Sequence, residues 1–155
     1  MESTLSNEFV YRELEETDYE GYIELMQKFK KYDYIVTREN FSIYLNKMKV
    51  EDLAKIVVLY SPTKKRILGA GTVFILNKLH YRPVGQIEDV VITRSLRGLG
   101  FGHTMVNNLK YIALHEYNCY KVILHCVDEN IGFYEKCGFV KSGVEMRYDN
   151  DIIPN

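Results

Sequence analysis

Hydrophobic and polar positions recur along the chain at intervals that predict both strands and helices. Residues 9–14 alternate as in a half-buried strand, and residues 54–60 form a β-branched run typical of a buried strand. A charged turn follows, and residues 67–76 then return as a second apolar strand, which predicts a hairpin. Gly69 and Gly71 in this second strand indicate a bulge or a close backbone approach.

Two helices are expected in the N-terminal half. Thr17-Asp-Tyr-Glu20 has the pattern of a capping box, so a helix is predicted from there to about Phe29. A second helix is predicted to begin near Thr37. Its apolar residues fall on one face at helical spacing: Phe41, Tyr44, Leu45 and Met48.

The C-terminal half predicts a further alternation of strands and helices. We expect a loop over residues 81–85, a strand over 86–93, a helix over 103–116, a strand over 120–127, a short helix over 130–137 and a last strand over 139–148. Gly138 stands where a left-handed helix stop belongs. This order predicts a mixed α/β layer structure in one domain over residues 1–155.

Composition narrows the class of protein. The 155 residues carry 20 Lys and Arg against 21 Asp and Glu, a net charge of −1, which argues against a broad nucleic-acid interface. No apolar run approaches the roughly 20 residues of a membrane span. Residues 1–7 lack the features of a signal peptide, so we expect a cytoplasmic protein without a membrane partner. The spacing of Cys119, Cys126 and Cys137 matches no zinc site; we expect reduced thiols, with Cys126 and Cys137 buried.

A glycine-rich segment stands between a predicted strand and a predicted helix. Its sequence is Arg97-Gly-Leu-Gly-Phe-Gly102, and glycines there let backbone N–H groups converge on an anion at the helix N-terminus. No Gly-Lys-Ser/Thr follows, so this is not a Walker loop, and the spacing is not that of a dinucleotide fingerprint. Taken alone, the three glycines are explained equally well by a tight turn.

The pattern Arg97-x-x-Gly100-x-Gly102 matches the acyl-CoA loop of the GNAT N-acetyltransferase superfamily. Within it, the chain resembles the glucosamine 6-phosphate N-acetyltransferases. The similarity is specific over residues 85–146 and looser over the N-terminal half. It rests on Gln86-Ile-Glu-Asp-Val-Val, Asn118-Cys-Tyr-Lys-Val-Ile-Leu, Phe133-Tyr-Glu-Lys-Cys-Gly-Phe and Gly143-Val-Glu-Met. The resemblance implies a mostly antiparallel sheet flanked by helices and splayed at Val90, and a homodimer that shares its C-terminal strands.

The resemblance also implies acetyl-CoA as the cosubstrate. Residues 90–92 would pair with the pantetheine arm as an added strand does, and residues 98–103 would cradle the pyrophosphate with backbone N–H groups. Asn130, Phe133 and Tyr134 would line the thioester end. The implied cofactor-binding residues are Val90, Val91, Ile92, Arg97, Gly98, Leu99, Gly100, Phe101, Gly102, His103, Asn130, Phe133 and Tyr134.

Glucosamine 6-phosphate is the acceptor that the resemblance implies. Tyr120 and Lys121 correspond to positions that contact the substrate across a dimer interface. Relatives carry a basic residue at the position of Asp149, and Arg147 stands two residues before it. The implied substrate-binding residues are Lys78, His80, Glu88, Asp89, Val90, Tyr120, Lys121 and Arg147. Arg147, Lys121 and Lys78 are the candidates for the phosphate.

The chemistry of acyl transfer assigns the catalytic candidates. A backbone N–H near Val90 would stabilise the oxyanion, and Tyr134 would protonate the leaving thiolate of CoA. Glu88 and Asp89 would orient the amine or take its proton. His125 replaces a carboxylate of the relatives; on the predicted strand it shares a face with Lys121, and in its neutral form it would orient the amine or its water. No metal is needed, because the thioester is already activated.

Each candidate has a structural alternative. Glu88 and Asp89 would otherwise be an exposed pair at a strand end, Tyr134 a core tyrosine and His125 a wall residue. The function predicted is acetyl transfer to the amine of glucosamine 6-phosphate in the route to UDP-N-acetylglucosamine. The alternatives are a GNAT enzyme for a peptide, polyamine or other amino sugar, and a non-catalytic module that binds acetyl-CoA.

Overall fold

The computed structural model describes residues 8–31 and 33–150, and its contacts group the chain into two compact units, residues 1–124 and 125–155. The N-terminal segment without signal-peptide features lies outside the described residues. The prediction of one domain over the whole chain stays a prediction, and each unit is described by itself below.

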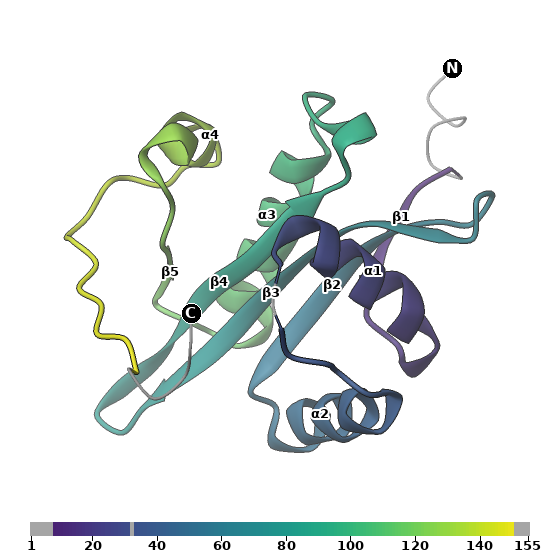
Figure 1. The fold of residues 1–155 in the computed structure, drawn as a ribbon. Helices are drawn as coiled ribbons and strands as arrows, with labels where there is room; N and C mark the ends of the chain where they lie inside the picture. The colour runs from purple at the N-terminus through teal and green to yellow at the C-terminus, as the bar shows by residue number, and fades with distance from the viewer. Residues whose placement is uncertain (1–7, 32, 151–155) are drawn as a thin grey trace. The chain divides into compact units, whose positions relative to one another are not determined.

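The first unit is built on a five-stranded sheet with the order β1-β2-β3-β4-β5 (Figure 1). Neighbouring strands pair antiparallel from β1 to β4, and β5 pairs parallel to β4. This is the mixed, mostly antiparallel sheet that was predicted. The strands are β1 (Val10–Glu13), β2 (Ala54–Ser61), β3 (Arg66–Lys78), β4 (Tyr81–Ile92) and β5 (Lys121–Leu124).

The pairing of β4 with β5 covers only part of β4. Residues 84–87 pair with residues 121–124, whereas the remainder of β4, up to Ile92, pairs only with β3 within the first unit. The predicted opening of the sheet at Val90 therefore begins where this parallel pairing ends.

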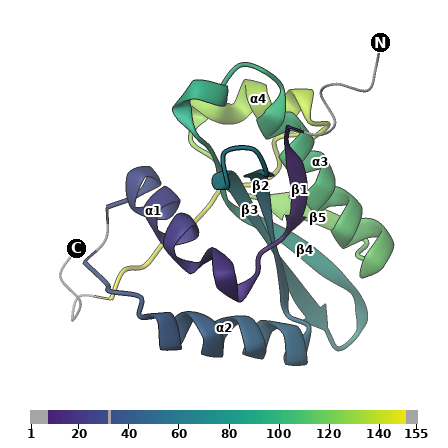
Figure 2. The ribbon, with the colours of Figure 1, turned by 90° about the vertical axis from the view of Figure 1, so that its right-hand side faces the viewer.

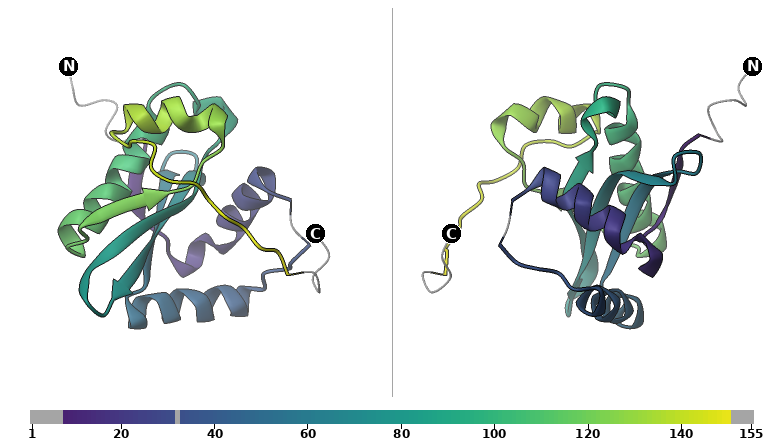
Figure 3. Two further views of the ribbon diagram at one scale, coloured as in Figure 1. Left: turned by 90° about the vertical axis from the view of Figure 1, so that its left-hand side faces the viewer. Right: turned by 45° about the vertical axis from the view of Figure 1, so that its right-hand side comes forward.

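Helices cover both faces of the sheet (Figure 2). Helices α1 and α2 lie on one face and α3 on the other, as the left view of Figure 3 also shows. Their bounds are α1 (Tyr19–Phe29), α2 (Arg38–Glu51) and α3 (Phe101–Tyr111). The α1 side has a continuous core of Leu14, Leu25, Met26, Phe41, Ile56, Val58, Ile67, Ala70 and Val91. On the other face, α3 buries Met105, Val106 and Leu109 completely, each 0% exposed.

The start of α1 differs from the prediction. The capping box joins Glu15 and Asp18 instead of Thr17 and Glu20, and it closes a 3-10 turn, η1 (Glu16–Asp18), that precedes α1. Asp18 is only 7% exposed. Its burial is tolerated because its carboxylate accepts hydrogen bonds from Arg12 at 2.6 and 2.9 Å and from the Glu15 N–H at 2.8 Å. Burial raises the pKa of Asp18, but the bonds from Arg12 and Glu15 and the charge of Arg12 outweigh it, so the pKa lies below its ordinary value.

The start of α2 is as predicted. The Thr37 hydroxyl accepts a hydrogen bond from the Asn40 N–H at 3.1 Å, which satisfies a donor of the first turn. Phe41, on the predicted apolar face, is buried and packs edge to face against Tyr19, with ring centroids 5.4 Å apart.

Residues 81–85 belong to β4, so the loop predicted there is wrong. Pro83 suggested a loop, since proline cannot donate to a sheet ladder. The pairing of β3 with β4 shifts between Leu76 and Lys78, beside this proline, so the missing N–H falls at an irregularity. The Pro83 carbonyl accepts a hydrogen bond from the Tyr120 N–H at 3.1 Å.

The helix and strand that follow β4 are also shifted. Helix α3 begins at Phe101, two residues before the predicted start, and continues into a π-helical segment, η3 (Ile112–Glu116). The strand predicted over residues 120–127 is shorter, because β5 ends at Leu124.

The second unit contains the short 3-10 turn η4 (Asp128–Asn130) and α4 (Ile131–Lys136). Gly138 ends this region with a φ of +88°, the left-handed conformation predicted for it. The last predicted strand is wrong: residues 139–150 contain neither strand nor helix, and Val140, Val144 and Met146 are 83–90% exposed. Alternation alone does not make a strand, because its backbone needs a neighbour to bond with.

No helix within residues 8–31 and 33–150 is long and apolar enough to cross a membrane.

Candidate active site

The centre of the candidate site is a β-bulge in β4. Thr72 pairs with Glu88 and Ala70 with Val91, so two residues of β4, Asp89 and Val90, lie opposite the single residue between Ala70 and Thr72 in β3. Such a bulge turns a side chain away from the regular alternation. It explains two adjacent acids in an otherwise apolar strand.

Asp89 adopts the conformation that the bulge requires. Its φ is +52°, in the left-handed region that a short polar side chain tolerates better than a β-branched one. Opposite it stands Gly71, where an added Cβ would lie 2.7 Å from Leu109 Cδ1. Glycine at this position therefore lets α3 approach the sheet directly behind the bulge, which confirms the close approach predicted at Gly69 and Gly71.

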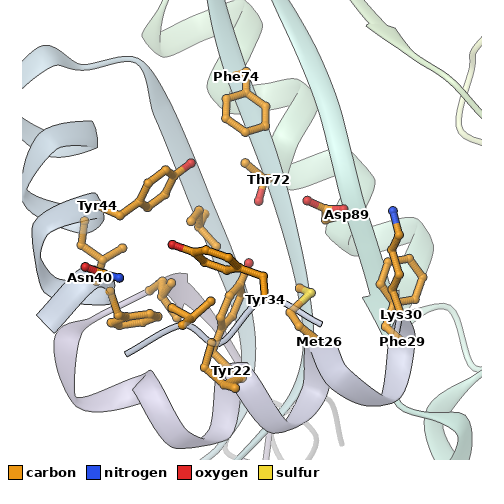
Figure 4. A pocket seen from close by; sticks show the side chains of 16 residues that line it. Tyr22, Met26, Phe29, Lys30, Tyr34, Asn40, Tyr44, Thr72, Phe74 and Asp89 are labelled. Carbon is orange, nitrogen blue, oxygen red and sulfur yellow. The ribbon is translucent and has the colours of Figure 1, made fainter. Parts of the chain in front are cut away.

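A cavity of about 420 Å³ lies between α1, α2 and strands β3 and β4 (Figure 4). Its walls are mostly apolar and aromatic, and its charged lining residues in the described part of the chain are Asp89 and Lys30. Polar groups come from Tyr22, Tyr34, Asn40, Tyr44 and Thr72. A concave, largely apolar space with a few polar groups is typical of a small-molecule site.

Tyr44 and Asp89 interact electrostatically in this cavity. Burial raises the pKa of the Tyr44 hydroxyl, and the charge of Asp89 raises it further. The hydroxyl therefore stays protonated at neutral pH and is a hydrogen-bond donor for a ligand. Glu88 and Asp89 are both exposed, but Glu88 accepts a hydrogen bond from Gln86 Nε2 at 2.6 Å and does not line the cavity.

The glycine-rich segment leads from β4 into α3. Gly98 and Gly100 have φ values of +77° and +89°, and an added Cβ at either would meet no atom within 4 Å. Gly100 is the N-cap residue of α3 and offers no side chain to the N–H groups of the first turn. The segment therefore presents backbone donors and open space at the positive end of an 11-residue helix.

Two side chains fix this segment. Arg97 Nε donates to the Ile92 carbonyl at 3.0 Å, which ties the segment to the end of β4. The Tyr11 hydroxyl, from β1, donates to the Phe101 carbonyl at 2.8 Å, so the first residue of α3 is held by the far strand of the sheet. Both contacts pre-organise the backbone donors.

Four predicted acceptor contacts lie away from the cavity: Lys78, His80, Tyr120 and Lys121 do not line it. Tyr81 and Tyr120 pack edge to face with ring centroids 4.9 Å apart, and Lys121 Nζ lies 5.2 Å from the Tyr120 ring centroid. These residues gather where β4 and β5 begin, whereas Asp89 lies near the other end of β4.

Tyr134 lies in α4 of the second unit. Its ring packs edge to face against Phe133, with centroids 4.9 Å apart, and near Phe139 at 6.1 Å. Burial raises the pKa of Tyr134, and the neighbouring thiols of Cys126 and Cys137 raise it further. The phenol therefore remains protonated at neutral pH, the form that a general acid requires.

The other predicted site residues of the second unit are exposed. His125 follows the end of β5, so the argument that it shares a strand face with Lys121 is wrong. Arg147 Nε lies 2.6 Å from the Asp149 carboxylate, and the Arg147 side chain is 72% exposed. All three cysteines are free; Cys137 is buried as predicted, but Cys126 is exposed, which corrects that prediction.

Sequence reasoning missed most of the cavity. Tyr22 comes from α1, Tyr34 from the segment before α2, and Tyr44 from α2 itself, and none of them belongs to a motif. The apolar periodicity of the second helix placed Tyr44 on one face with Phe41, which was the available signal. Within the described residues, no group of three His, Cys, Asp or Glu side chains is arranged to hold a metal ion.

The mixed sheet, the bulge in β4 and the glycine segment that leads into α3 are together the features expected of an acetyltransferase fold. The sequence profile of the acetyltransferase (GNAT) family matches residues 9–139, and the chain belongs to this family. Curated relatives include the glucosamine 6-phosphate N-acetyltransferase of Candida albicans, 36% identical over 89% of this chain and 93% of the relative. The Dictyostelium discoideum glucosamine 6-phosphate N-acetyltransferase 1 is 31% identical over 94% of both chains.

Solved structures agree with the sequence relatives. The crystal structure of glucosamine-6-phosphate N-acetyltransferase from Arabidopsis thaliana matches with a TM-score of 0.84 at 34% identity, over 92% of this chain and 99% of that one. An acetyltransferase from Trypanosoma brucei matches with a TM-score of 0.82 at 30% identity, over 92% and 99%. The resemblance to this family and its fold is therefore confirmed.

Proposed function

We propose that this chain transfers the acetyl group of acetyl-CoA to the amine of glucosamine 6-phosphate, giving N-acetylglucosamine 6-phosphate and CoA. Relatives at 31–36% identity over most of both chains carry this activity in their names. The observation that carries the proposal in the structure is the bulge that turns Asp89 into the cavity beside the strand edge at Val90.

Acetyl-CoA would bind along the free edge of β4 and the start of α3. Its pyrophosphate would accept hydrogen bonds from the backbone of residues 98–103, and its pantetheine arm would pair with residues 90–92. Asn130, Phe133 and Tyr134 would surround the thioester. GNAT acetyltransferases use acetyl-CoA as their cosubstrate, and the positive φ of Gly98 and Gly100 supports this use of the loop.

The acceptor would occupy the cavity with its amine toward Asp89. The amine nitrogen attacks the thioester carbonyl carbon, and the Val90 N–H stabilises the oxyanion that forms. The carbon–sulfur bond then breaks, the nitrogen loses a proton to Asp89, Glu88 or His125 directly or through water, and Tyr134 gives a proton to the CoA thiolate. The atoms and charges of substrates and products balance in these steps without a metal ion.

The residues that lie away from the cavity require a second chain. Lys78, His80, Tyr120 and Lys121, together with Arg147, would contact the acceptor bound to the other copy of a homodimer. The exposed residues 139–150 would supply part of the surface that the two copies share. We place the enzyme in the cytoplasm, in the route to UDP-N-acetylglucosamine.

The test is release of free thiol from acetyl-CoA with a panel of amines: glucosamine 6-phosphate, glucosamine, a polyamine and a peptide. We expect turnover with glucosamine 6-phosphate at the lowest KM. A preference for another amine would replace the acceptor, and absence of turnover with every amine would indicate a module that only binds acetyl-CoA.

Asp89→Asn tests the role of the carboxylate that the bulge presents. Asparagine also tolerates a positive φ, so the variant should fold, while kcat/KM for the acceptor falls and the affinity for acetyl-CoA is kept. Glu39→Gln, an exposed acid on α2 outside the cavity, is the matched control. Equal kinetics in the two variants would remove Asp89 from the mechanism.

A further inference from the structure

The first turn of α3 carries backbone donors of the glycine segment. The Thr104 N–H donates to the Gly100 carbonyl at 3.1 Å, and Gly100 is the N-cap residue of the helix. The N–H groups of Phe101 and Gly102 therefore precede the helical ladder and have no acceptor within the helix. The direction of each N–H depends on how the peptide group that contains it is held.

Each of these N–H groups shares a rigid peptide group with a carbonyl. Because the peptide bond is planar and trans, the Phe101 carbonyl and the Gly102 N–H lie in one plane and point in opposite directions. The Tyr11 hydroxyl donates a hydrogen bond to this carbonyl at 2.8 Å. A donor that fixes the carbonyl also fixes the N–H on the far side of the same peptide group.

The preceding peptide group is held in a similar way. Its N–H is that of Phe101, and its Gly100 carbonyl accepts a hydrogen bond from the Thr104 hydroxyl at 3.2 Å. Burial raises the pKa of the Tyr11 hydroxyl more than a hydrogen bond with the Thr104 side chain lowers it. The Tyr11 phenol therefore stays protonated at neutral pH and remains able to donate.

Tyr11 connects this turn to the sheet. It lies in β1, which pairs with β2 along its whole length. Side chains alternate along a strand, so Arg12 binds Asp18 beside α1, whereas Tyr11 reaches α3 on the other face. The Phe101 ring also packs edge to face against Phe9, with centroids 4.9 Å apart. The first residue of α3 is thus held through both its ring and its carbonyl.

Arg97 fixes the other end of the glycine segment. Its Nε donates to the Ile92 carbonyl at 3.0 Å. Gly98 and Gly100 stand between that bond and α3, and an added Cβ at either would meet no atom within 4 Å. Because the segment between is loosely packed, the bond from Arg97 does not set the direction of the donors in the first turn. The contact from β1 acts on them directly.

We propose that Tyr11 is a positioning residue for acetyl-CoA, whose hydroxyl aligns the Gly102 N–H with the pyrophosphate and strengthens it as a donor. The inference rests on the proposed function, because it assumes that the first turn of α3 binds the pyrophosphate. A hydrogen bond to the carbonyl polarises the peptide group and so strengthens the hydrogen bond made by its N–H. A donor that is aligned before the ligand arrives also loses less conformational freedom on binding.

Two variants with the same chemical change test the role of Tyr11. Tyr11→Phe removes the hydroxyl and keeps the ring. Tyr19→Phe is the matched control, because the Tyr19 hydroxyl also donates to a backbone carbonyl, that of Val36 at 2.6 Å, but lies in α1 on the other face of the sheet. Urea denaturation of each variant would show that it folds.

Three measurements separate positioning from general loss of structure. Calorimetry gives the dissociation constant of CoA and needs no turnover. Thiol release with glucosamine 6-phosphate gives kcat and KM for acetyl-CoA. The same assay with S-acetylpantetheine, a thioester that lacks the pyrophosphate, gives kcat/KM for a donor that the Gly102 N–H cannot hold in this way.

Tyr11→Phe should raise the dissociation constant of CoA and the KM for acetyl-CoA by about three- to tenfold, within the range that one neutral hydrogen bond accounts for. The kcat with acetyl-CoA should be unchanged, and so should kcat/KM with S-acetylpantetheine. Tyr19→Phe should keep the parental affinity for CoA.

Three results would overturn the inference and leave the proposed function standing. The first is an unaltered affinity for CoA in folded Tyr11→Phe, and the second is an equal loss with acetyl-CoA and with S-acetylpantetheine. The third is an equal loss of CoA affinity in Tyr19→Phe. Absence of turnover in the parent would instead refute the proposed function, and the dissociation constants of CoA would still decide the role of Tyr11.

Discussion

Gly71→Ala is a small substitution at a position where the structure leaves no room for it. Gly71 lies opposite the β4 bulge on one side and against α3 on the other. An added Cβ would lie 2.7 Å from Leu109 Cδ1, and 3.2 and 3.3 Å from Cγ and Sδ of Met105. Since carbon atoms in contact are separated by about 3.5–4.0 Å, the overlap with Leu109 is about 1 Å.

The overlap cannot be relieved by moving a side chain into solvent. Leu109 and Met105 are both 0% exposed, so either their side chains must leave their present rotamers inside the packed core or α3 must move away from β3. Overpacking of this kind costs about 1–3 kcal/mol. For a chain of 155 residues, this corresponds to a fall in Tm of roughly 2–12 °C.

Gly21→Ala is the matched control, because it adds the same methyl group within α1. There the new Cβ would lie 3.5 Å from Ile67 Cδ1, an ordinary van der Waals contact. Alanine is favoured over glycine inside a helix by about 1 kcal/mol. This variant should therefore be as stable as the parent or up to about 1 kcal/mol more stable.

Urea denaturation followed by circular dichroism measures both variants against the parent. The expected result is opposite signs for the same chemical change. If Gly71→Ala unfolds at the same urea concentration as the parent, α3 does not pack against β3 as described. If both variants lose the same stability, the effect belongs to alanine in general and not to the space behind the bulge.

Three further substitutions test the loop, the acid and the buried ion pair. Gly100→Ala should weaken acetyl-CoA binding in calorimetry, whereas Gly143→Ala, with a similar φ of +80° and equally open surroundings, should not; equal affinities would exclude the loop as the pyrophosphate site. Tyr134→Phe should lower kcat by about 10²-fold with little change in acetyl-CoA affinity, and a parental kcat would leave Tyr134 only a packing role. Asp18→Asn should lower the free energy of unfolding at pH 7 by about 2–4 kcal/mol, because it leaves Arg12 without its charged partner. The folded pKa of Asp18 is lowered, so this stabilisation is present above its ordinary pKa near 3.8 and is lost as pH falls through the folded value. A difference in free energy of unfolding between parent and variant that is as large at about pH 3 as at pH 7 would contradict the assignment.

Local pattern was sufficient for most of the sheet and the helices. The β-branched run over residues 54–60 and the capping threonine of α2 act over a few neighbours, and both were predicted correctly. Pro83 misled the prediction because the irregular pairing that accommodates it depends on β3. Residues 139–148 alternate like a strand, but whether they form one depends on a neighbour that the pattern does not reveal.

The candidate site divides in the same way. The glycine segment is contiguous in sequence, so its position before α3 could be predicted. Glu88 and Asp89 were conspicuous as acids in an apolar strand, but only the bulge distinguishes the one that lines the cavity. Tyr34 gave no signal, because a tyrosine in a connecting segment belongs to no motif; its place in the cavity follows from the packing of α1 and α2 over the sheet.

The bulge also sets the phase of β4. Before it, residues 84–88 of β4 pair with β3 in one register, and after it Val91 and Ile92 pair in a register displaced by one residue. Since side chains alternate, a displacement by one exchanges the two faces. Deleting a single residue at the bulge would make the ladder regular and leave Val91 opposite Ala70, so the entry into the glycine segment would keep its phase, but the left-handed backbone that presents Asp89 would be lost. In this strand the length of the chain is as strictly determined as the identity of any side chain.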